Sequence, residues 1–123
     1  IPKWTDSGRI NYQKKTEEKL KFMFKNCCTN DYLTLLNGKL YRCPFSANTM
    51  NLKAIPVKDS EFIDLEKNSS SEELKREMID LYHKPEFLTA CNYCNGRDFT
   101  TPRIETAIQA KEPISYSEYK IVK

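Results

Sequence analysis

Residues 36–43 read Leu-Asn-Gly-Lys-Leu-Tyr-Arg-Cys and predict a tight β-hairpin that ends on a cysteine. Asn37 and Gly38 both tolerate the positive φ angles of a type I′ turn, and Asn-Gly is a strong hairpin signal. Strand-forming residues flank the turn on both sides. A two-residue loop fixes the register of the hairpin. The predicted pairs are Leu36 with Lys39, Thr34 with Tyr41, and Tyr32 with Cys43.

Side chains along this hairpin should alternate between its two faces. One predicted face carries Tyr32, Thr34, Tyr41 and Cys43. The other carries Leu33, Leu35 and Leu40, and we expect it to pack on the core. Cys43 would then be held at the end of a rigid strand, on the face opposite the leucines.

Residues 16–28 predict a helix that leads to a pair of cysteines. Thr16 can cap its first turn, and apolar residues recur at i, i+3, i+4, i+7 and i+8. These residues are Leu20, Met23, Phe24, Cys27 and Cys28. The helix should therefore deliver the cysteine pair at its C-terminal end.

A second helix is expected over residues 71–83, capped by Ser70 and stopped by Pro85. Its predicted buried stripe consists of Leu74, Met78, Leu81 and Tyr82. Residues 44–59 are expected to form a loop, because Pro44 and Pro56 read as breakers. Residues 61–65 predict a short strand or turn, and residues 103–109 a final short strand.

The composition indicates one globular domain spanning residues 1–123. Hydrophobic residues make up 39% of the chain and charged residues 30%. A net charge of +3 is too small to indicate a nucleic-acid or membrane partner. Since no apolar run approaches the roughly 20 residues of a membrane span and no signal peptide is visible, we expect a cytoplasmic location. Five cysteines in a reducing compartment favour metal or redox chemistry over a disulfide framework.

The spacing of the cysteines predicts a metal site. Cys91-x-x-Cys94 followed by Gly96 has the form of a knuckle whose backbone amides can point at a bound sulfur. Four thiolates from a helix end, a strand end and this turn are the ligand set of an iron–sulfur cluster or a zinc ion. Both metals use the same ligands, so zinc stays an alternative, as does a metal-free domain with reduced thiols.

These motifs resemble the SPASM and twitch domains found at the C-terminus of many radical SAM enzymes. Cys28, nine residues, Gly38, four residues and Cys43 fit the family pattern C-x(9–15)-G-x(4)-C, and the C-x-x-C element follows. The resemblance covers about residues 16–109 and implies a [4Fe–4S] cluster. The implied ligands are Cys28, Cys43, Cys91 and Cys94. Cys27 lies ten residues before Gly38, fits the spacing too, and is the alternative to Cys28.

The resemblance also indicates what the chain lacks. The three further cysteines of a full SPASM domain are absent, so the shorter twitch-like α+β form with one cluster is expected. The C-x(3)-C-x(2)-C motif that binds S-adenosylmethionine is absent as well. We therefore expect a C-terminal fragment of a longer radical SAM protein, packed on the catalytic barrel upstream. The cluster would transfer electrons or position the substrate; the alternative is a zinc domain that mediates protein contacts.

Other residues are weaker candidates for the site. Arg42, Arg97 and Arg103 lie near the cysteines and would bind an anionic substrate or balance the cluster charge, unless they are ordinary surface arginines. His83 is the single histidine, and its expected role is an interaction with a helix C-terminus. The acidic residues Glu61, Asp64 and Glu66 are expected to form a solvated edge.

Overall fold

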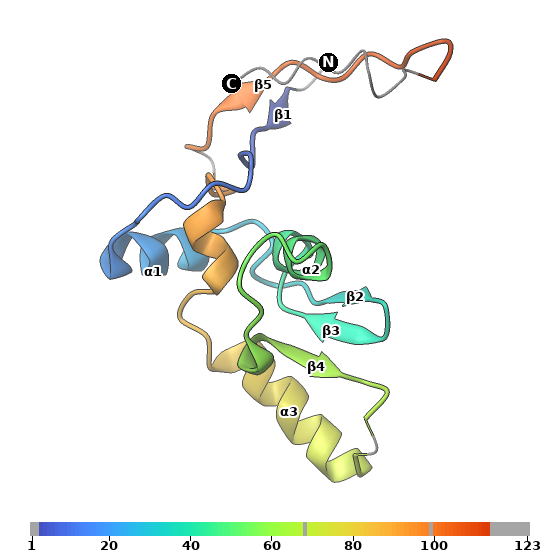
Figure 1. Cartoon of the computed structure of the whole chain (residues 1–123). Helices are drawn as coiled ribbons and strands as arrows, with labels where there is room; N and C mark the ends of the chain where they lie inside the picture. The colour runs from blue at the N-terminus through green and yellow to red at the C-terminus, as the bar shows by residue number, and fades with distance from the viewer. Residues whose placement is uncertain (1–2, 68, 99, 114–123) are drawn as a thin grey trace.

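The structure is a computed structural model that describes residues 3–67, 69–98 and 100–113, and these residues include a three-stranded antiparallel sheet and three α-helices (Figure 1). In chain order the elements are β1 (Trp4–Thr5), α1 (Glu17–Lys25), β2 (Thr34–Leu36), β3 (Lys39–Tyr41), α2 (Pro44–Asn51), the 3₁₀ helix η1 (Asp59–Glu61), β4 (Phe62–Asp64), α3 (Ser71–His83), the 3₁₀ helix η2 (Thr89–Tyr93) and β5 (Arg103–Ile104). The expected small α+β domain with a hairpin and at least two helices is confirmed.

The hairpin of β2 and β3 forms as the Asn-Gly turn predicts. Asn37 has a φ of 49° and Gly38 a φ of 74°, so both turn residues adopt the left-handed region. Thr34 lies opposite Tyr41, which is the predicted register. The ladder stops at that pair, and β4 continues the sheet on the other side of β3. Of the short strand or turn expected over residues 61–65, the structure shows the strand.

The prediction of which hairpin face packs on the core is wrong. Leu35, on the expected core face, is 65% exposed, whereas Tyr41 on the opposite face is only 3% exposed. Tyr41 belongs to the hydrophobic core with Ala47 and Met50 of α2. The reason is that α2 covers the Tyr41 face and packs against both β2 and β3.

The prediction of a loop over residues 44–59 is also wrong, because α2 occupies its first half. Pro44 stands in the first turn of this helix, where its fixed φ is favourable and its missing N–H costs nothing. Cys43 caps the helix through its side chain. Ala47 is completely buried, so the helix is held by packing despite its weak amphipathic pattern. Pro44 therefore begins a helix and fixes Cys43 at the helix start.

The other two helices begin where their caps predict. Thr16 Oγ1 accepts a hydrogen bond of 3.2 Å from the backbone N–H of Lys19 at the start of α1. Ser70 Oγ accepts one of 3.2 Å from the N–H of Glu73 at the start of α3. However, α1 ends at Lys25, so the two cysteines lie in the turn that follows rather than on the helix.

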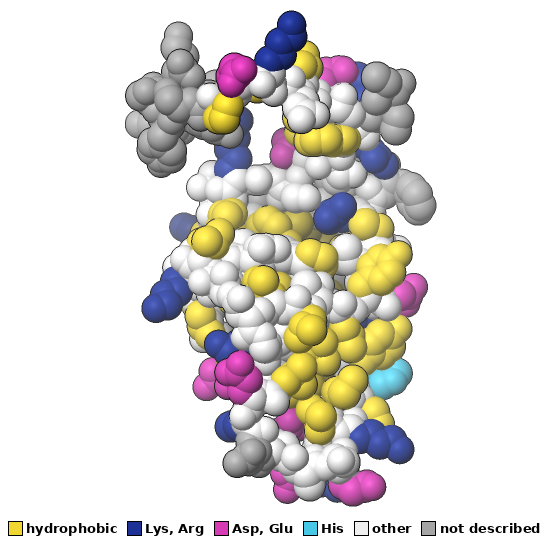
Figure 2. Space-filling view, turned by 90° about the vertical axis from the view of Figure 1, so that its right-hand side faces the viewer, with side chains coloured by type: hydrophobic (Ala, Val, Ile, Leu, Met, Phe, Trp, Pro, Cys, Tyr) yellow, Lys and Arg dark blue, Asp and Glu magenta, His cyan; other side chains and the backbone are white. Residues whose placement is uncertain are grey.

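The predicted stripe of α3 is only partly buried. Leu81 is 4% exposed and α3 packs against β4, but Met78 is 38% exposed. Figure 2 shows hydrophobic side chains gathered on one face of the molecule. Several large apolar side chains, Leu35 among them, therefore remain at the surface.

Two terminal segments pair away from the main sheet. β1 and β5 form an antiparallel ribbon in which Trp4 lies opposite Ile104, and Figure 1 shows it projecting from the rest of the molecule. The strand expected within residues 103–109 is thus reduced to two residues. In the described part of the chain, no helix is both long enough and apolar enough to span a membrane.

Candidate metal centre

A cavity with a volume of about 40 Å³ is lined by four of the five cysteines. They are Cys27, Cys43, Cys91 and Cys94. This volume exceeds the roughly 10–15 Å³ that one buried water requires. All five cysteines lie in the described residues, and none of them forms a disulfide. The fold therefore gathers four free thiols from separate segments around one space.

The structure brings Cys27 to this cavity and leaves Cys28 outside it. Cys27 Sγ lies 3.1 Å from Thr29 Oγ1, and Cys27 and Thr29 both line the cavity. Cys28 is exposed, and its backbone N–H donates a 3.0 Å hydrogen bond to the carbonyl oxygen of Arg97. This bond ties the turn after α1 to the segment after η2.

Backbone amides donate to three of the four sulfurs. The N–H of Ser46 lies 3.3 Å from Cys43 Sγ, in the first turn of α2. Cys91 Sγ accepts from the N–H of Leu88 at 3.4 Å. Cys94 Sγ accepts from the N–H of Gly96 at 3.3 Å. Such bonds favour the thiolate form, which is the form that binds metals.

Gly96 is required by the geometry of this last contact. Its φ of +92° lies in a region that side chains strongly disfavour. A Cβ added at this position would also lie 3.3 Å from Met23 Cε. The knuckle anticipated after Cys94 therefore depends on glycine both for its backbone conformation and for close packing against α1.

The remaining cavity wall is mainly apolar, and burial against it raises the pKa of Cys43, Cys91 and Cys94. Met23, Phe24 and Leu88 contribute to this wall. Burial raises the pKa of Cys43 to about 11 and that of Cys91 to about 12, although the amide donors oppose the shift. Without a metal, Cys43 and Cys91 are thus neutral near pH 7, and metal binding to them would release protons.

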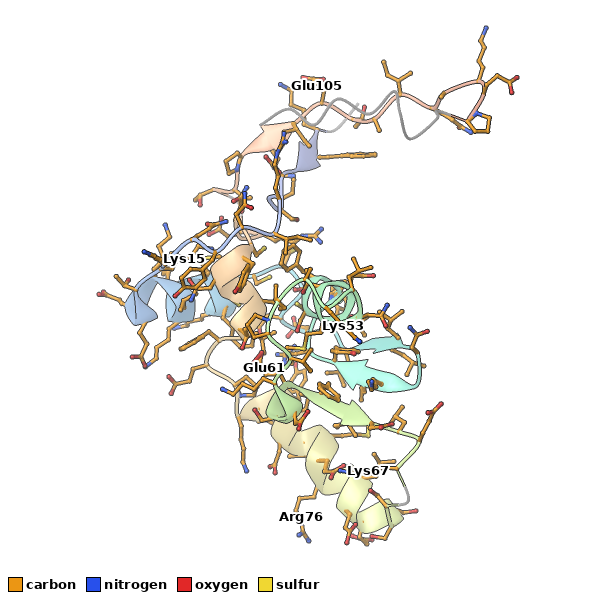
Figure 3. All side chains as sticks on the ribbon, in the orientation of Figure 1. Lys15, Lys53, Glu61, Lys67, Arg76 and Glu105 are labelled. Carbon is orange, nitrogen blue, oxygen red and sulfur yellow. The ribbon has the colours of Figure 1, made fainter. Side chains whose placement is uncertain are left out.

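Lys15 adds a positive charge behind the C-x-x-C turn. Figure 3 shows it beside η2, where its Nζ donates to the carbonyl oxygen of Cys91 at 2.7 Å and also to that of Cys94. Burial lowers the pKa of this lysine, and the nearby thiols oppose the shift. No local sequence pattern indicates this role of Lys15, because it lies more than 70 residues from its partners.

Glu61 positions the start of η2 and is not part of a solvated edge. It is 6% exposed, and its carboxylate accepts from the N–H of Thr89 at 2.8 Å and from Thr89 Oγ1 at 2.6 Å. These bonds anchor the 3₁₀ helix that carries Cys91.

The other candidates divide between the cavity and the surface. Arg42 and Arg97 line the cavity. Arg103 is exposed on β5, and neither it nor His83 lines the cavity. His83 instead packs edge-on against Tyr82, with ring centroids 4.9 Å apart. Two of the three flanking arginines are thus placed to act on the thiol cluster.

The sulfurs surround the cavity without converging on one point. Within the described residues, no group of three or more His, Cys, Asp or Glu side chains is arranged to hold a metal ion. The cavity thiols lie close enough to interact, since a thiolate at another cavity cysteine would raise the pKa of both Cys43 and Cys91. The four cysteines therefore line one cavity without being arranged, in this structure, around a single ion position.

Comparison of the chain with models of protein families, with curated proteins and with solved structures gives no match. The likeness to SPASM and twitch domains therefore rests on the cysteine and glycine spacing alone.

Proposed function

We propose that this domain binds a [4Fe–4S] cluster through the four cavity cysteines, with Cys27 in the position first assigned to Cys28. The observation that carries this proposal is that four free thiols from three separate segments line one cavity. Four cysteine thiolates are the usual ligand set of such a cluster. The amide donors to three of the sulfurs support the same assignment.

The arrangement of the thiols favours a cluster over a single zinc ion. Zinc requires four sulfurs at about 2.3 Å from one point, in a tetrahedron. The described thiols surround a space instead, and they are not arranged to hold one ion. A cluster does not require the four sulfurs to meet at one ion, because each of its four irons binds a different thiolate. Zinc remains the second candidate, since its ligands are the same.

The spacing also supports a role as the auxiliary domain of a radical SAM enzyme. Cys27 lies ten residues before Gly38 and keeps the pattern C-x(9–15)-G-x(4)-C. With four cysteine ligands the cluster has no open iron, so it would transfer electrons or help to seat a substrate. The chain lacks C-x(3)-C-x(2)-C, so cleavage of S-adenosylmethionine would belong to a barrel upstream in the same parent protein.

Anaerobic purification followed by metal and sulfide analysis tests this proposal. We expect iron and acid-labile sulfide in about equal amounts, with broad visible absorption. Stoichiometric zinc with no iron after anaerobic reconstitution would support the zinc domain instead. Protein that binds neither metal would contradict both. The parent sequence provides a second test, because the enzyme proposal requires C-x(3)-C-x(2)-C upstream of Ile1.

A further inference from the structure

Arg42 is a buried cation in the wall of the cysteine cavity. It is only 3% exposed, although arginine is rarely buried without a partner charge. Its Nη1 donates to the carbonyl oxygen of Tyr32 at 3.0 Å. Its Nη2 donates to the carbonyl oxygen of Asn30 and, at 2.9 Å, to Asn30 Oδ1. All of these acceptors are neutral, and the ion pairs among the described residues do not include Arg42.

Two aromatic rings hold the guanidinium in place. Its Cζ lies 4.6 Å from the ring centroid of Tyr82 and 5.4 Å from that of Phe24. Aromatic rings stabilise a cation but do not neutralise it. A buried charge without a counter-charge destabilises the fold, so an anion bound next to Arg42 would be stabilising.

Two unsatisfied hydrogen-bond donors belong to residues that line the same cavity. Among the described residues, three buried side-chain polar atoms lack a hydrogen-bond partner: Arg42 Nε, Arg97 Nε and Ser46 Oγ. The two arginines both line the cavity, and no carboxylate lines it. A buried donor left unsatisfied is destabilising, and a bound acceptor would remove that cost. The two Nε–H groups are therefore suited to an anion inside the cavity.

A metal centre with four thiolate ligands is such an anion, because the ligands carry more negative charge than a zinc ion can balance. We propose that Arg42 and Arg97 donate their Nε–H groups to the sulfur of a metal–thiolate centre and neutralise part of its charge. This inference rests on the proposed function. Its consequence is that both arginines strengthen metal binding and, for a redox cluster, stabilise the reduced and more negative state.

The test compares Arg42→Gln and Arg97→Gln with wild-type protein and with Arg76→Gln. Arg76 is an exposed arginine of α3, and Figure 3 shows it pointing away from the rest of the molecule, so this change is a matched control. The apparent Kd for Zn²⁺ is measured by competition with a chelating dye. The reduction potential of the reconstituted cluster is measured by redox titration.

We expect each cavity variant to bind Zn²⁺ at least tenfold more weakly than wild type. The reduction potential should become more negative by a tenfold change in the reduction equilibrium, which is about 59 mV for one electron. Arg76→Gln should change neither. A merely structural role for Arg42, in holding the Asn30 and Tyr32 carbonyls, would destabilise metal-free and loaded protein equally and leave the Kd unchanged.

An unchanged Kd and potential in Arg97→Gln would overturn the inference, and this half-buried position serves if Arg42→Gln fails to fold. Equal shifts in Arg76→Gln would also overturn it, because a long-range charge effect would then suffice. These results would leave the proposed function intact. Failure of wild-type protein to bind any metal is a separate result, and it would overturn both.

Discussion

Replacing Cys27 and Cys28 separately by serine should distinguish a metal ligand from a surface thiol. The two variants are matched, because the same chemical change is made at adjacent positions. Cys27 lines the cavity, whereas Cys28 is exposed. We expect Cys27→Ser to lose the cluster and Cys28→Ser to keep it. In metal-free protein, Cys28→Ser should change the free energy of unfolding by no more than about 0.5 kcal/mol.

The size of the effect follows from linkage between metal binding and folding. A metal present at about a thousand times its Kd stabilises the folded state by about 4 kcal/mol. For a chain of this length, 1 kcal/mol corresponds to a Tm change of roughly 4 °C. Loss of the Cys27 ligand should therefore lower the Tm of loaded protein by roughly 15 °C. Cys28→Ser should lower it by about 2 °C or less, on the same scale.

The assay measures iron and sulfide content together with thermal unfolding, with and without the metal, under anaerobic conditions. Alkylation of loaded wild-type protein adds an independent readout, since Cys28 should react while the other thiols are protected. Full iron content in Cys27→Ser together with loss in Cys28→Ser would refute the reasoning. It would mean that the turn after α1 rearranges on metal binding and presents the other cysteine.

Three further predictions concern the fold. Gly96→Ala should destabilise the protein by about 1–3 kcal/mol in chemical unfolding, because a side chain is strained at this φ and crowds Met23; an unchanged midpoint would contradict this. Tyr41→Ala should cost about 3–5 kcal/mol and Leu35→Ala less than about 0.5, and the reverse order would contradict the observed hairpin faces. Metal-free protein should lose stability as the pH rises from about 9 to 11. Over this range the Cys43 thiol ionises in the unfolded chain but stays protonated in the folded one, where burial has raised its pKa to about 11. A Cys43→Ala variant should show a weaker pH dependence in the same unfolding titration.

Features decided by neighbouring residues were predictable from the sequence. Asn37-Gly38 determines the turn and its register, because only a few residue types adopt two successive positive φ angles. Thr16 and Ser70 determine where two helices begin, since each cap bonds an amide three residues away. The C-x-x-C knuckle followed by glycine is a local feature of the same kind.

Errors arose where one element decides the environment of another. The missed helix α2 covers one face of the hairpin and reverses the expected inside and outside, so that Tyr41 is buried and Leu35 exposed. Strand periodicity identifies two faces but cannot say which one is covered. Pro44 was the available signal for α2, since proline is favoured in the first turn of a helix.

The sequence by itself therefore determined the number of thiols, their local turns and the spacing that suggests a metal. Only the tertiary structure decided which thiols line the cavity. Cys27 and Cys28 both fit the spacing, but Cys27 lines the cavity and Cys28 is exposed. α1 ends at Lys25, so both cysteines lie in the turn that follows it. In that turn the backbone N–H of Cys28 bonds the carbonyl oxygen of Arg97, and the Cys28 side chain is exposed. The positions of the positively charged side chains near the thiols also depend on the tertiary structure. The positions of Lys15 and Arg42 beside the thiols come from contacts across the fold, which no local sequence pattern records.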